Sequence, residues 1–301
     1  MNRSEVLLLG GSGFIGTALA NKFAREGRQV HVLALNAPSA AMNANFLQGS
    51  LDNPDLLAKL LPRCSTVIHL ASATTPGNSA NHPALELGNL APSLRLLEAL
   101  QAYPEIHLIF FSSGGTIYGN PQHLPVHEDE PIAPLSYHGA GKVALEAFFH
   151  AFRSCGQAAT ILRPSAYGPA QALKRGFGLV RTMLEHARCG TPLEIWGDGE
   201  NVRDFIYIDD ITEACARFVA LPQDSGTYNL GSGRGYSINQ VRRIVEQVTS
   251  TELKAVYHPA RGIDVREVVL DISRLNARLS WKPQTSMEEG VRYTWNWLKQ
   301  A

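Results

Sequence analysis

The sequence predicts an α/β fold built on a doubly wound parallel sheet, with a smaller α+β part after it. In the first half of the 301 residues, short apolar runs alternate with helical patterns. Strands that alternate with helices form parallel sheets through right-handed crossovers. A glycine-rich segment, Gly10–Gly16, lies between the first apolar run and the first helical pattern. Beyond Arg163-Pro164 the elements shorten and Gly and Pro become frequent, which indicates the smaller part.

Apolar periodicity places the elements of the first half. Apolar residues that recur every three or four positions predict helices from Phe14 to Gly27 and from Leu87 to Leu100. A third helix is expected from Gly139 to Phe152. The expected strands are the short runs Val6–Leu9, Val30–Leu35, Thr66–Leu70 and Ile106–Ser112.

We divide the chain into residues 1–165, which contain the parallel sheet, and residues 166–301, which form the smaller substrate-binding part. Segments around 202–230 are expected to return to the first part. Further strand-like runs occur at Phe205–Ile208 and Val268–Leu270. The two parts should leave a cleft at the carboxyl ends of the strands, where such sheets bind ligands.

Composition excludes several kinds of partner. Lys+Arg and Asp+Glu number 27 each, so no overall field directs the chain to nucleic acid or an anionic membrane. No window reaches the roughly 20 apolar residues of a membrane span, and the apolar run before Gly10 is too short for a signal peptide. The cysteines and histidines lack metal-ligand spacing. We therefore expect a cytoplasmic protein without a metal, whose thiols are reduced and mostly buried.

The glycine-rich segment predicts a dinucleotide site of the Rossmann type. Gly10, Gly13 and Gly16 fit the pattern G-x-x-G-x-x-G. Glycines at these spacings allow a tight turn, close approach of a pyrophosphate and close packing of helix on strand. Phe14 and Ile15 open the helix, whose free N–H groups and positive dipole end attract phosphate.

The residue that usually binds the adenine ribose is missing. An acid is expected about 20 residues after the glycines, near the end of the second strand. Ala34 occupies that place, and no acidic residue occurs between Glu26 and Asp52. Asn36 is a candidate for hydrogen bonding a ribose hydroxyl, and also a common turn residue. The choice between NAD and NADP stays open, with NAD preferred.

Several motifs along nearly the whole chain carry a family resemblance. They include Gly10–Gly16, Val67–Ala71, Asn89-Leu90, Ser112–Gly119, Gly139–Lys142, Arg163-Pro164, Trp196–Gly199, Arg203–Asp210, Asn229–Gly233 and Trp281–Pro283. In this order they resemble the extended short-chain dehydrogenase/reductase family, in particular its NAD-dependent epimerase/dehydratase branch that acts on nucleotide sugars. The resemblance implies that Leu70, Ala71, Asn89, Ser112 and Lys142 contact the cofactor. It also implies that Arg203 and Arg261 bind the diphosphate of the substrate.

The expected catalytic pair departs from the family pattern. The resemblance implies a hydride transfer to NAD while a tyrosine, four residues before a lysine, removes the hydroxyl proton. Here the lysine is Lys142, four residues earlier stands His138, and Tyr137 is one position too early. Three readings stay open. Either His138 or Tyr137 is the acid/base, or His138 is an exposed residue of the first helical turn and the site is inactive.

The substrate side of the motifs departs as well. Relatives carry a serine or threonine where this chain has Gly114, so Ser113 or Thr116 is expected to supply the missing hydroxyl. The segment Arg163–Gly168 lacks the asparagine and one further residue found in relatives. The contacts of this chain with the sugar of the substrate are therefore expected to differ from those in relatives.

These observations lead to three functional hypotheses. The first is an NAD(P)-dependent enzyme acting on a UDP-linked sugar, with UDP-hexose 4-epimerase-like activity through a transient keto-sugar. The second is an NAD(P)H-dependent keto-sugar reductase, and the third is a non-catalytic dinucleotide-binding regulator. The resemblance also implies a homodimer, formed by the helices at Leu87–Leu100 and Gly139–Phe152.

Overall fold

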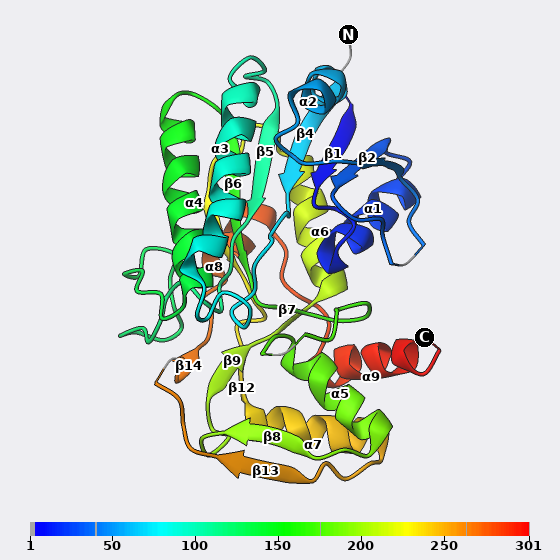
Figure 1. Ribbon diagram of the computed structural model, residues 1–301, viewed down its shortest axis with the longest axis vertical. Coiled ribbons are helices and arrows are strands. Elements are labelled where there is room, and N and C mark those ends of the chain that lie inside the picture. The colour runs from blue at the N-terminus through cyan, green and yellow to red at the C-terminus, as the bar shows by residue number, and fades with distance from the viewer. Residues whose placement is uncertain (1–3, 40, 175, 263, 301) are drawn as a thin grey trace.

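A seven-stranded parallel sheet forms the upper part of the molecule (Figure 1). The computed structural model describes residues 4–39, 41–174, 176–262 and 264–300. The strand order β11-β6-β5-β4-β1-β2-β3, with every pairing parallel, confirms the predicted Rossmann-type α/β fold. The strands are β1 (Glu5–Leu9), β2 (Val30–Ala34), β3 (Asn45–Gln48), β4 (Cys64–His69), β5 (His107–Phe111), β6 (Ala159–Pro164) and β11 (Thr227–Leu230).

Helices cover both faces of this sheet. In β1, Val6 and Leu8 pack into one apolar cluster, while Leu7 and Leu9 pack into the cluster on the opposite face. A strand buried on both faces reads as a continuous apolar run, which explains why the strand signals were clear. The first cluster contains residues of α1 (Phe14–Arg25), α6 (Ile208–Val219) and α8 (Ser273–Leu279). The second contains residues of α2 (Pro54–Leu60), α3 (Leu87–Leu100) and α4 (Tyr137–Ser154). Two 3-10 turns, η1 (Leu61–Arg63) and η2 (Pro83–Glu86), precede β4 and α3.

A smaller part lies below the carboxyl ends of the strands (Figure 1). Its apolar core contains residues of the helices Leu179–Cys189, Ile238–Thr249 and Met287–Leu298. It also contains residues of the strand Leu193–Trp196, which pairs with the strand Ala255–His258. The chain enters it after β6, returns to the sheet for α6 and β11, and enters it again afterwards. Its elements are β7 (Ala166–Tyr167), α5 (Leu179–Cys189), β8 (Leu193–Trp196), β9 (Val202–Asp204), β10 (Ile206–Tyr207), β12 (Gly235–Ser237), α7 (Ile238–Thr249), β13 (Ala255–His258), β14 (Glu267–Val268) and α9 (Met287–Leu298).

The two strands expected in the smaller part are shorter than predicted. In the run Phe205–Ile208 only Ile206 and Tyr207 form a strand, because Ile208 already begins α6. Asp209 and Asp210 lie in the first turn of that helix, where carboxylates interact favourably with the helix dipole. In the run Val268–Leu270, β14 ends at Val268, and Leu270 forms an isolated bridge with Val126.

The expectation of mostly buried cysteines was wrong for half of them. Cys64 and Cys215 are buried, whereas Cys155 and Cys189 are exposed at the carboxyl ends of α4 and α5. Across the described ranges, none of the helices is long and apolar enough to cross a membrane. No cluster of metal-ligand side chains occurs among the same residues.

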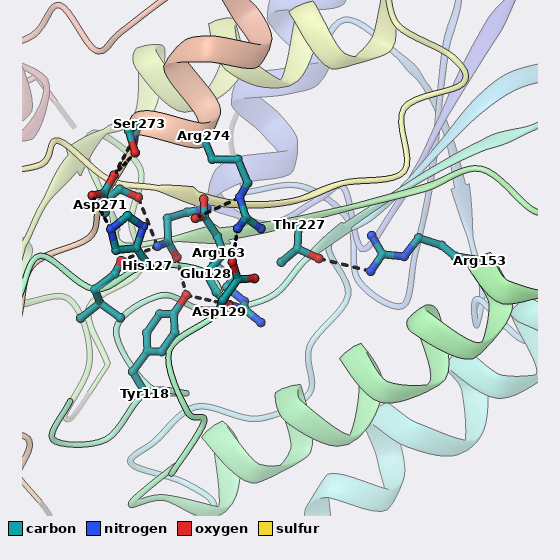
Figure 2. Close-up of polar contacts among 12 residues, drawn as sticks. Tyr118, His127, Glu128, Asp129, Arg153, Arg163, Thr227, Asp271, Ser273 and Arg274 are labelled. Atoms are coloured by element: carbon teal, nitrogen blue, oxygen red, sulfur yellow. Dashed lines mark hydrogen bonds and ion pairs between the residues drawn. The ribbon is translucent and has the colours of Figure 1, made fainter. Parts of the chain in front are cut away.

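Three motif segments that are distant in the sequence meet in one buried polar network, part of which is shown in Figure 2. The Arg163 guanidinium donates to the Tyr118 hydroxyl oxygen at 2.7 Å, and Tyr118 donates to Asn229 Oδ1 at 2.6 Å. Arg163 also forms a buried ion pair with Glu146 of α4 at 2.6 Å. Burial raises the pKa of Tyr118 to about 12, so its hydroxyl keeps the proton that it donates.

The network extends to the segment that precedes α4. Arg163 donates to the backbone carbonyl of Glu128 at 2.8 Å, and the Glu128 carboxylate accepts from the Asn229 N–H at 2.9 Å. Arg274 of α8 faces the same carboxylate at 3.5 Å (Figure 2). The loop between β5 and α4 is thereby fixed to β6, β11 and α8, and this loop carries part of the candidate site.

Candidate active site

One cavity of about 710 Å³ lies between the sheet and the smaller part. It follows the carboxyl ends of the parallel strands, where ligands bind in sheets of this type. Most of the residues predicted from the sequence line it, and they come from both parts of the chain. The predicted lining residues are Gly10, Gly13, Phe14, Ile15, Gly16, Leu70, Ser112, Ser113, Thr116, His138, Lys142, Arg203 and Arg261.

The glycine loop forms one end of the cavity, and its glycines have different roles. Gly10 has φ +74°, and a Cβ there would lie 2.5 Å from the Cα of Ala71. A Cβ on Gly16 would lie 2.3 Å from the Cα of Gly11. These two positions require glycine for the fold itself, and Ala71 acts as the close neighbour of Gly10 rather than as a lining residue of the cavity.

Gly13 leaves room for a ligand. A Cβ there would meet its nearest neighbour, the Gly10 carbonyl oxygen, at 3.7 Å. Gly13 is also the N-cap of α1, and no side chain caps the helix N–H groups. Uncapped N–H groups beside open space fit the pyrophosphate of a dinucleotide.

No acidic residue stands at the end of β2, where the adenine ribose of a dinucleotide is usually bound. β2 ends at Ala34, which is buried, and the next two residues, Leu35 and Asn36, are exposed. Asn36 does not line the cavity. Its predicted contact with a ribose hydroxyl therefore remains a prediction.

Lys142 lies at the inner end of the cavity on the buried side of α4. Its ammonium donates to the Phe111 carbonyl oxygen at 2.9 Å. Burial lowers the pKa of Lys142 to about 8, against the opposing attraction of Glu86 and Glu146. The lysine is thus held at the end of β5, next to the cavity wall formed by Ser112 and Ser113.

His138, and not Tyr137, faces the cavity. Ser136 is the N-cap of α4 and accepts from the Gly139 N–H at 3.1 Å, so Tyr137 is the first helical residue. Tyr137 is 48% exposed and lies outside the cavity, whereas His138 is 8% exposed and lines it. Of the three readings, the one in which His138 is an exposed residue of the first turn was therefore wrong on its exposure. Burial and the Lys142 charge lower the pKa of His138 to about 4, so the imidazole is neutral near pH 7.

Two residues that the sequence did not single out contact His138 or its neighbours. Thr74 Oγ1 lies 3.0 Å from His138 Nδ1 and donates to the Glu86 carboxylate at 3.0 Å. Asn89 is buried behind them and accepts from the Ala73 N–H at 2.7 Å, so it fixes the loop after β4 instead of lining the cavity. No periodicity or spacing reveals this cluster, because its members come from three separate segments.

Two hydroxyl groups among the cavity-lining residues have no hydrogen-bond partner within the described parts of the chain. Ser112 Oγ and Thr116 Oγ1 are buried and have no hydrogen-bond partner within the described segments. A buried polar group without a partner indicates a site for a ligand. A Cβ at Gly114 would lie 2.7 Å from both the Arg163 carbonyl oxygen and a methyl group of Leu270. A serine or threonine is therefore excluded at position 114 by packing.

Two arginines line the end of the cavity in the smaller part. Arg203 of β9 donates to the backbone carbonyls of Val202 and Val265 and forms no ion pair with any residue that the structure describes. Arg261 forms two hydrogen bonds to Asp264, at 2.9 and 2.8 Å, and lies 4.7 Å from the centre of the Trp196 ring. A guanidinium matches the oxygens of a phosphate in pairs, so both fit a diphosphate.

Comparison with known proteins identifies the family. The model of the NAD dependent epimerase/dehydratase family matches residues 6–231, more than half of the chain. The chain belongs to this family. The resemblance inferred from the motifs is thereby confirmed, together with the class of NAD-dependent epimerase/dehydratase-type enzymes.

Solved structures share the whole fold of this family member. The UDP-glucose 4-epimerase of Thermotoga maritima, solved with UDP-glucose, is 32% identical with a TM-score of 0.92 and covers 98% of this chain and 99% of its own. The UDP-glucose 4-epimerase of Thermus thermophilus, solved with NAD, is 30% identical with a TM-score of 0.88 and covers 99% of both chains. By sequence alone, the UDP-glucose 4-epimerase of Mycolicibacterium smegmatis is similar as well, with 28% identity over 96% of this chain and 97% of its own.

Proposed function

We propose that the chain is an NAD-dependent UDP-hexose 4-epimerase that acts through a transient keto-sugar. The observation that carries the proposal is the placement of His138 and Lys142 in one cavity with the glycine loop and two arginines. Similarity over the full length to epimerases solved with UDP-glucose or with NAD supports it.

The residues of the glycine loop and the end of β5 fit the cofactor. Gly13 and the uncapped start of α1 would hold the pyrophosphate, while Ser112 and Lys142 would face the nicotinamide ribose. A bound nicotinamide supplies reversible acceptance of a hydride. NAD is proposed over NADP because Leu35 and Asn36, the exposed residues after β2, carry no charge that would attract a 2′-phosphate.

His138 would move the proton of the reacting hydroxyl. As hydride leaves C4 of the sugar, the proton on its oxygen passes to the neutral imidazole, and a carbonyl group forms. Return of hydride to the other face, with return of the proton from His138, restores the hydroxyl with inverted configuration. Both the hydride and the proton return to the sugar, so the reaction has no net oxidation. Lys142 would stabilise the negative charge that develops on oxygen.

The decisive experiment supplies the purified protein with NAD and UDP-glucose and measures the UDP-sugars at equilibrium. Appearance of UDP-galactose supports the proposal. Steady consumption of NADH by a keto-sugar, without epimerisation, would instead indicate a reductase. Binding of NAD without turnover of UDP-glucose, UDP-glucuronic acid or UDP-N-acetylglucosamine would indicate a non-catalytic binding protein.

Gly13→Val is expected to abolish cofactor binding without unfolding the protein. The valine side chain would occupy the open space before α1, and φ −80° at this residue is accessible to any amino acid. Gly16→Val is the matched variant, because its side chain meets the Gly11 backbone and should destabilise the fold. Fluorescence titration with NADH and thermal unfolding distinguish the two effects. Tight NADH binding by Gly13→Val would contradict the placement of the pyrophosphate.

Arg203→Ala is expected to raise the KM for UDP-glucose by about 10- to 100-fold, the effect of losing a charged hydrogen bond. Arg261→Ala should act in the same direction. Binding of NAD should stay unchanged, because both arginines lie at the far end of the cavity from the glycine loop. Arg243→Ala is the control, since Arg243 is exposed on α7 outside the cavity. An unchanged KM in both cavity variants would exclude these arginines from substrate binding.

The kcat/KM profile is expected to show limbs near pH 4 and pH 8. The pKa of His138 is lowered to about 4, so the neutral imidazole is available from there upward. The pKa of Lys142 is lowered to about 8, so its positive charge is lost above that pH. The profile should be measured within the range where the fold, followed by circular dichroism, is intact. An acid limb near pH 6.5 would contradict the burial effect on His138.

We also propose a homodimer formed through α3 and α4. These helices pack against each other and expose Leu87 and Phe148 to solvent. Sedimentation equilibrium of the protein and of the double variant Leu87→Glu, Phe148→Glu tests it. A monomeric parent protein would contradict the proposal.

A further inference from the structure

A buried polar cluster behind His138 has no role in the proposed reaction as described so far. It consists of Thr74 from the loop after β4, Glu86 from η2, Asn89 from α3 and His138 from α4. All four side chains are buried. Gly141 makes room for it, since a Cβ there would lie 2.5 Å from Glu86 Oε2.

The directions of the hydrogen bonds in the cluster follow from one backbone donor, the Ala73 N–H, and one acceptor, the Glu86 carboxylate. The Ala73 N–H donates to Asn89 Oδ1 at 2.7 Å, which fixes the orientation of the amide. The Asn89 NH₂ group then donates to Thr74 Oγ1 at 2.8 Å and to Glu86 Oε2 at 2.9 Å. Both protons of this group are therefore used.

The hydrogen bonds of the Thr74 hydroxyl determine which ring nitrogen of His138 carries the proton of the neutral ring. A hydroxyl has one proton to donate and can accept two hydrogen bonds. The Glu86 carboxylate only accepts, so Thr74 must donate to it at 3.0 Å. Thr74 Oγ1 then accepts from Asn89 and from His138 Nδ1, which lies at 3.0 Å. Nδ1 consequently carries the proton of the neutral ring.

We propose that Glu86 and Thr74 are positioning residues that hold His138 as the Nδ1–H tautomer, with Nε2 unprotonated and directed to the substrate. This deepens the proposed epimerase function and rests on it for its catalytic consequence. Within the described residues Nε2 has no protein partner, and His138 lines the cavity. Nε2 is then the atom that accepts the sugar hydroxyl proton.

Glu86 has a second effect, on charge. When Nε2 accepts a proton, an imidazolium forms beside the Lys142 ammonium, and both are buried. Two like charges in such a site are costly unless a carboxylate offsets them. Glu146, the other buried carboxylate near Lys142, is already paired with Arg163. Glu86 Oε1 has no hydrogen-bond partner in the described ranges, so the Glu86 charge is available to stabilise the imidazolium.

Nitrogen NMR on the protein without substrate tests the tautomer directly. The protein is labelled with ring-¹⁵N histidine, and the His138 signals are identified as those lost in His138→Gln. The expected result is a protonated Nδ1 and an unprotonated Nε2 near pH 7. A protonated Nε2 would overturn the proposal. This result does not depend on any turnover, so it is distinguishable from failure of the epimerase assignment.

Kinetics of three variants test the role in proton transfer. Glu86→Gln keeps the shape and removes the charge, and Thr74→Val removes the hydroxyl. Each is expected to lower kcat by about 10- to 100-fold, with the KM for UDP-glucose changed less than about threefold. Thr74→Ser retains the hydroxyl and is expected to restore kcat to within about threefold of the parent.

The matched control is Ser93→Ala, which removes a buried hydroxyl that belongs to α3 and lies outside the cluster. Ser93 contacts a different histidine, His69, at 2.8 Å and donates to the Asn89 carbonyl at 2.6 Å. A merely structural role of the cluster predicts similar losses in Ser93→Ala and Thr74→Val, in kcat and in thermal stability. An unchanged kcat in Glu86→Gln, or a loss in Thr74→Ser equal to that in Thr74→Val, would overturn the proposal.

Discussion

Replacing His138 by alanine is expected to lower kcat for C4 epimerisation by about 10²- to 10⁴-fold, the usual contribution of a general acid/base. Tyr137→Phe is expected to leave kcat within about twofold of the parent, because an exposed hydroxyl outside the cavity transfers no proton to the substrate. The physical reason is the direction of the two side chains at the start of α4. Steady-state kinetics with UDP-glucose and NAD measures both effects.

The two variants also control for each other. They are adjacent in the sequence, so a general disturbance of the first turn of α4 would affect both. Binding of NADH by His138→Ala should persist, because the glycine loop is untouched. If Tyr137→Phe lost activity while His138→Ala kept it, the assignment of the acid/base would be reversed. Loss in neither variant would mean that another group transfers the proton.

Arg163→Ala is expected to destabilise the fold by about 3–5 kcal/mol in the free energy of unfolding. Arg163 and Glu146 are both buried, so the alanine leaves the Glu146 carboxylate without its partner. The Tyr118 hydroxyl and the Glu128 carbonyl lose a donor as well. Urea unfolding followed by circular dichroism gives the free energy.

The comparison for this prediction is an exposed ion pair. Arg95 of α3 is largely exposed and contacts Asp52 at 2.9 Å. Arg95→Ala should cost at most about 1 kcal/mol, as is usual for ion pairs in contact with solvent. Equal effects of the two substitutions would show that the buried network does not hold the fold together.

The sequence predicted the sheet and the glycine loop because both depend on local patterns. Strands such as Val6–Leu9 are apolar on both faces, and the helix stripe at Leu87–Leu100 has regular spacing. The short strands of the smaller part were less predictable, since β10 consists of Ile206 and Tyr207 alone. Such pieces are set by what they pair with, which the chain brings together only after folding.

The choice between Tyr137 and His138 could not be made from spacing. The direction of each side chain depends on where α4 begins, and Ser136 determines this by capping the Gly139 N–H. On a regular helix Tyr137 and His138 point about 100° apart, whereas a residue at the non-helical cap has no such fixed direction. The serine before the helix was visible in the sequence, but its hydrogen bond was not.

The polar clusters were beyond sequence reasoning for a different reason. Tyr118, Arg163 and Asn229 each belong to a recognised motif, yet Tyr118 contacts Arg163 at a separation of 45 positions and Asn229 at a separation of 111. Glu86 and Thr74 belong to no pattern that we singled out. Buried polar side chains can be recognised only once the partners that compensate their burial are known.

The route of the chain between the two parts has a consequence for how substrate enters. After β6 the backbone enters the smaller part with β7, α5, β8 and β9, and it returns to the sheet with α6 and β11. It enters the smaller part again with β12 and α7, returns to the sheet with α8, and ends in the smaller part with α9. Swinging the two parts apart about one pivot would twist several of these connections together. We therefore expect the two parts to stay together when substrate enters the cavity.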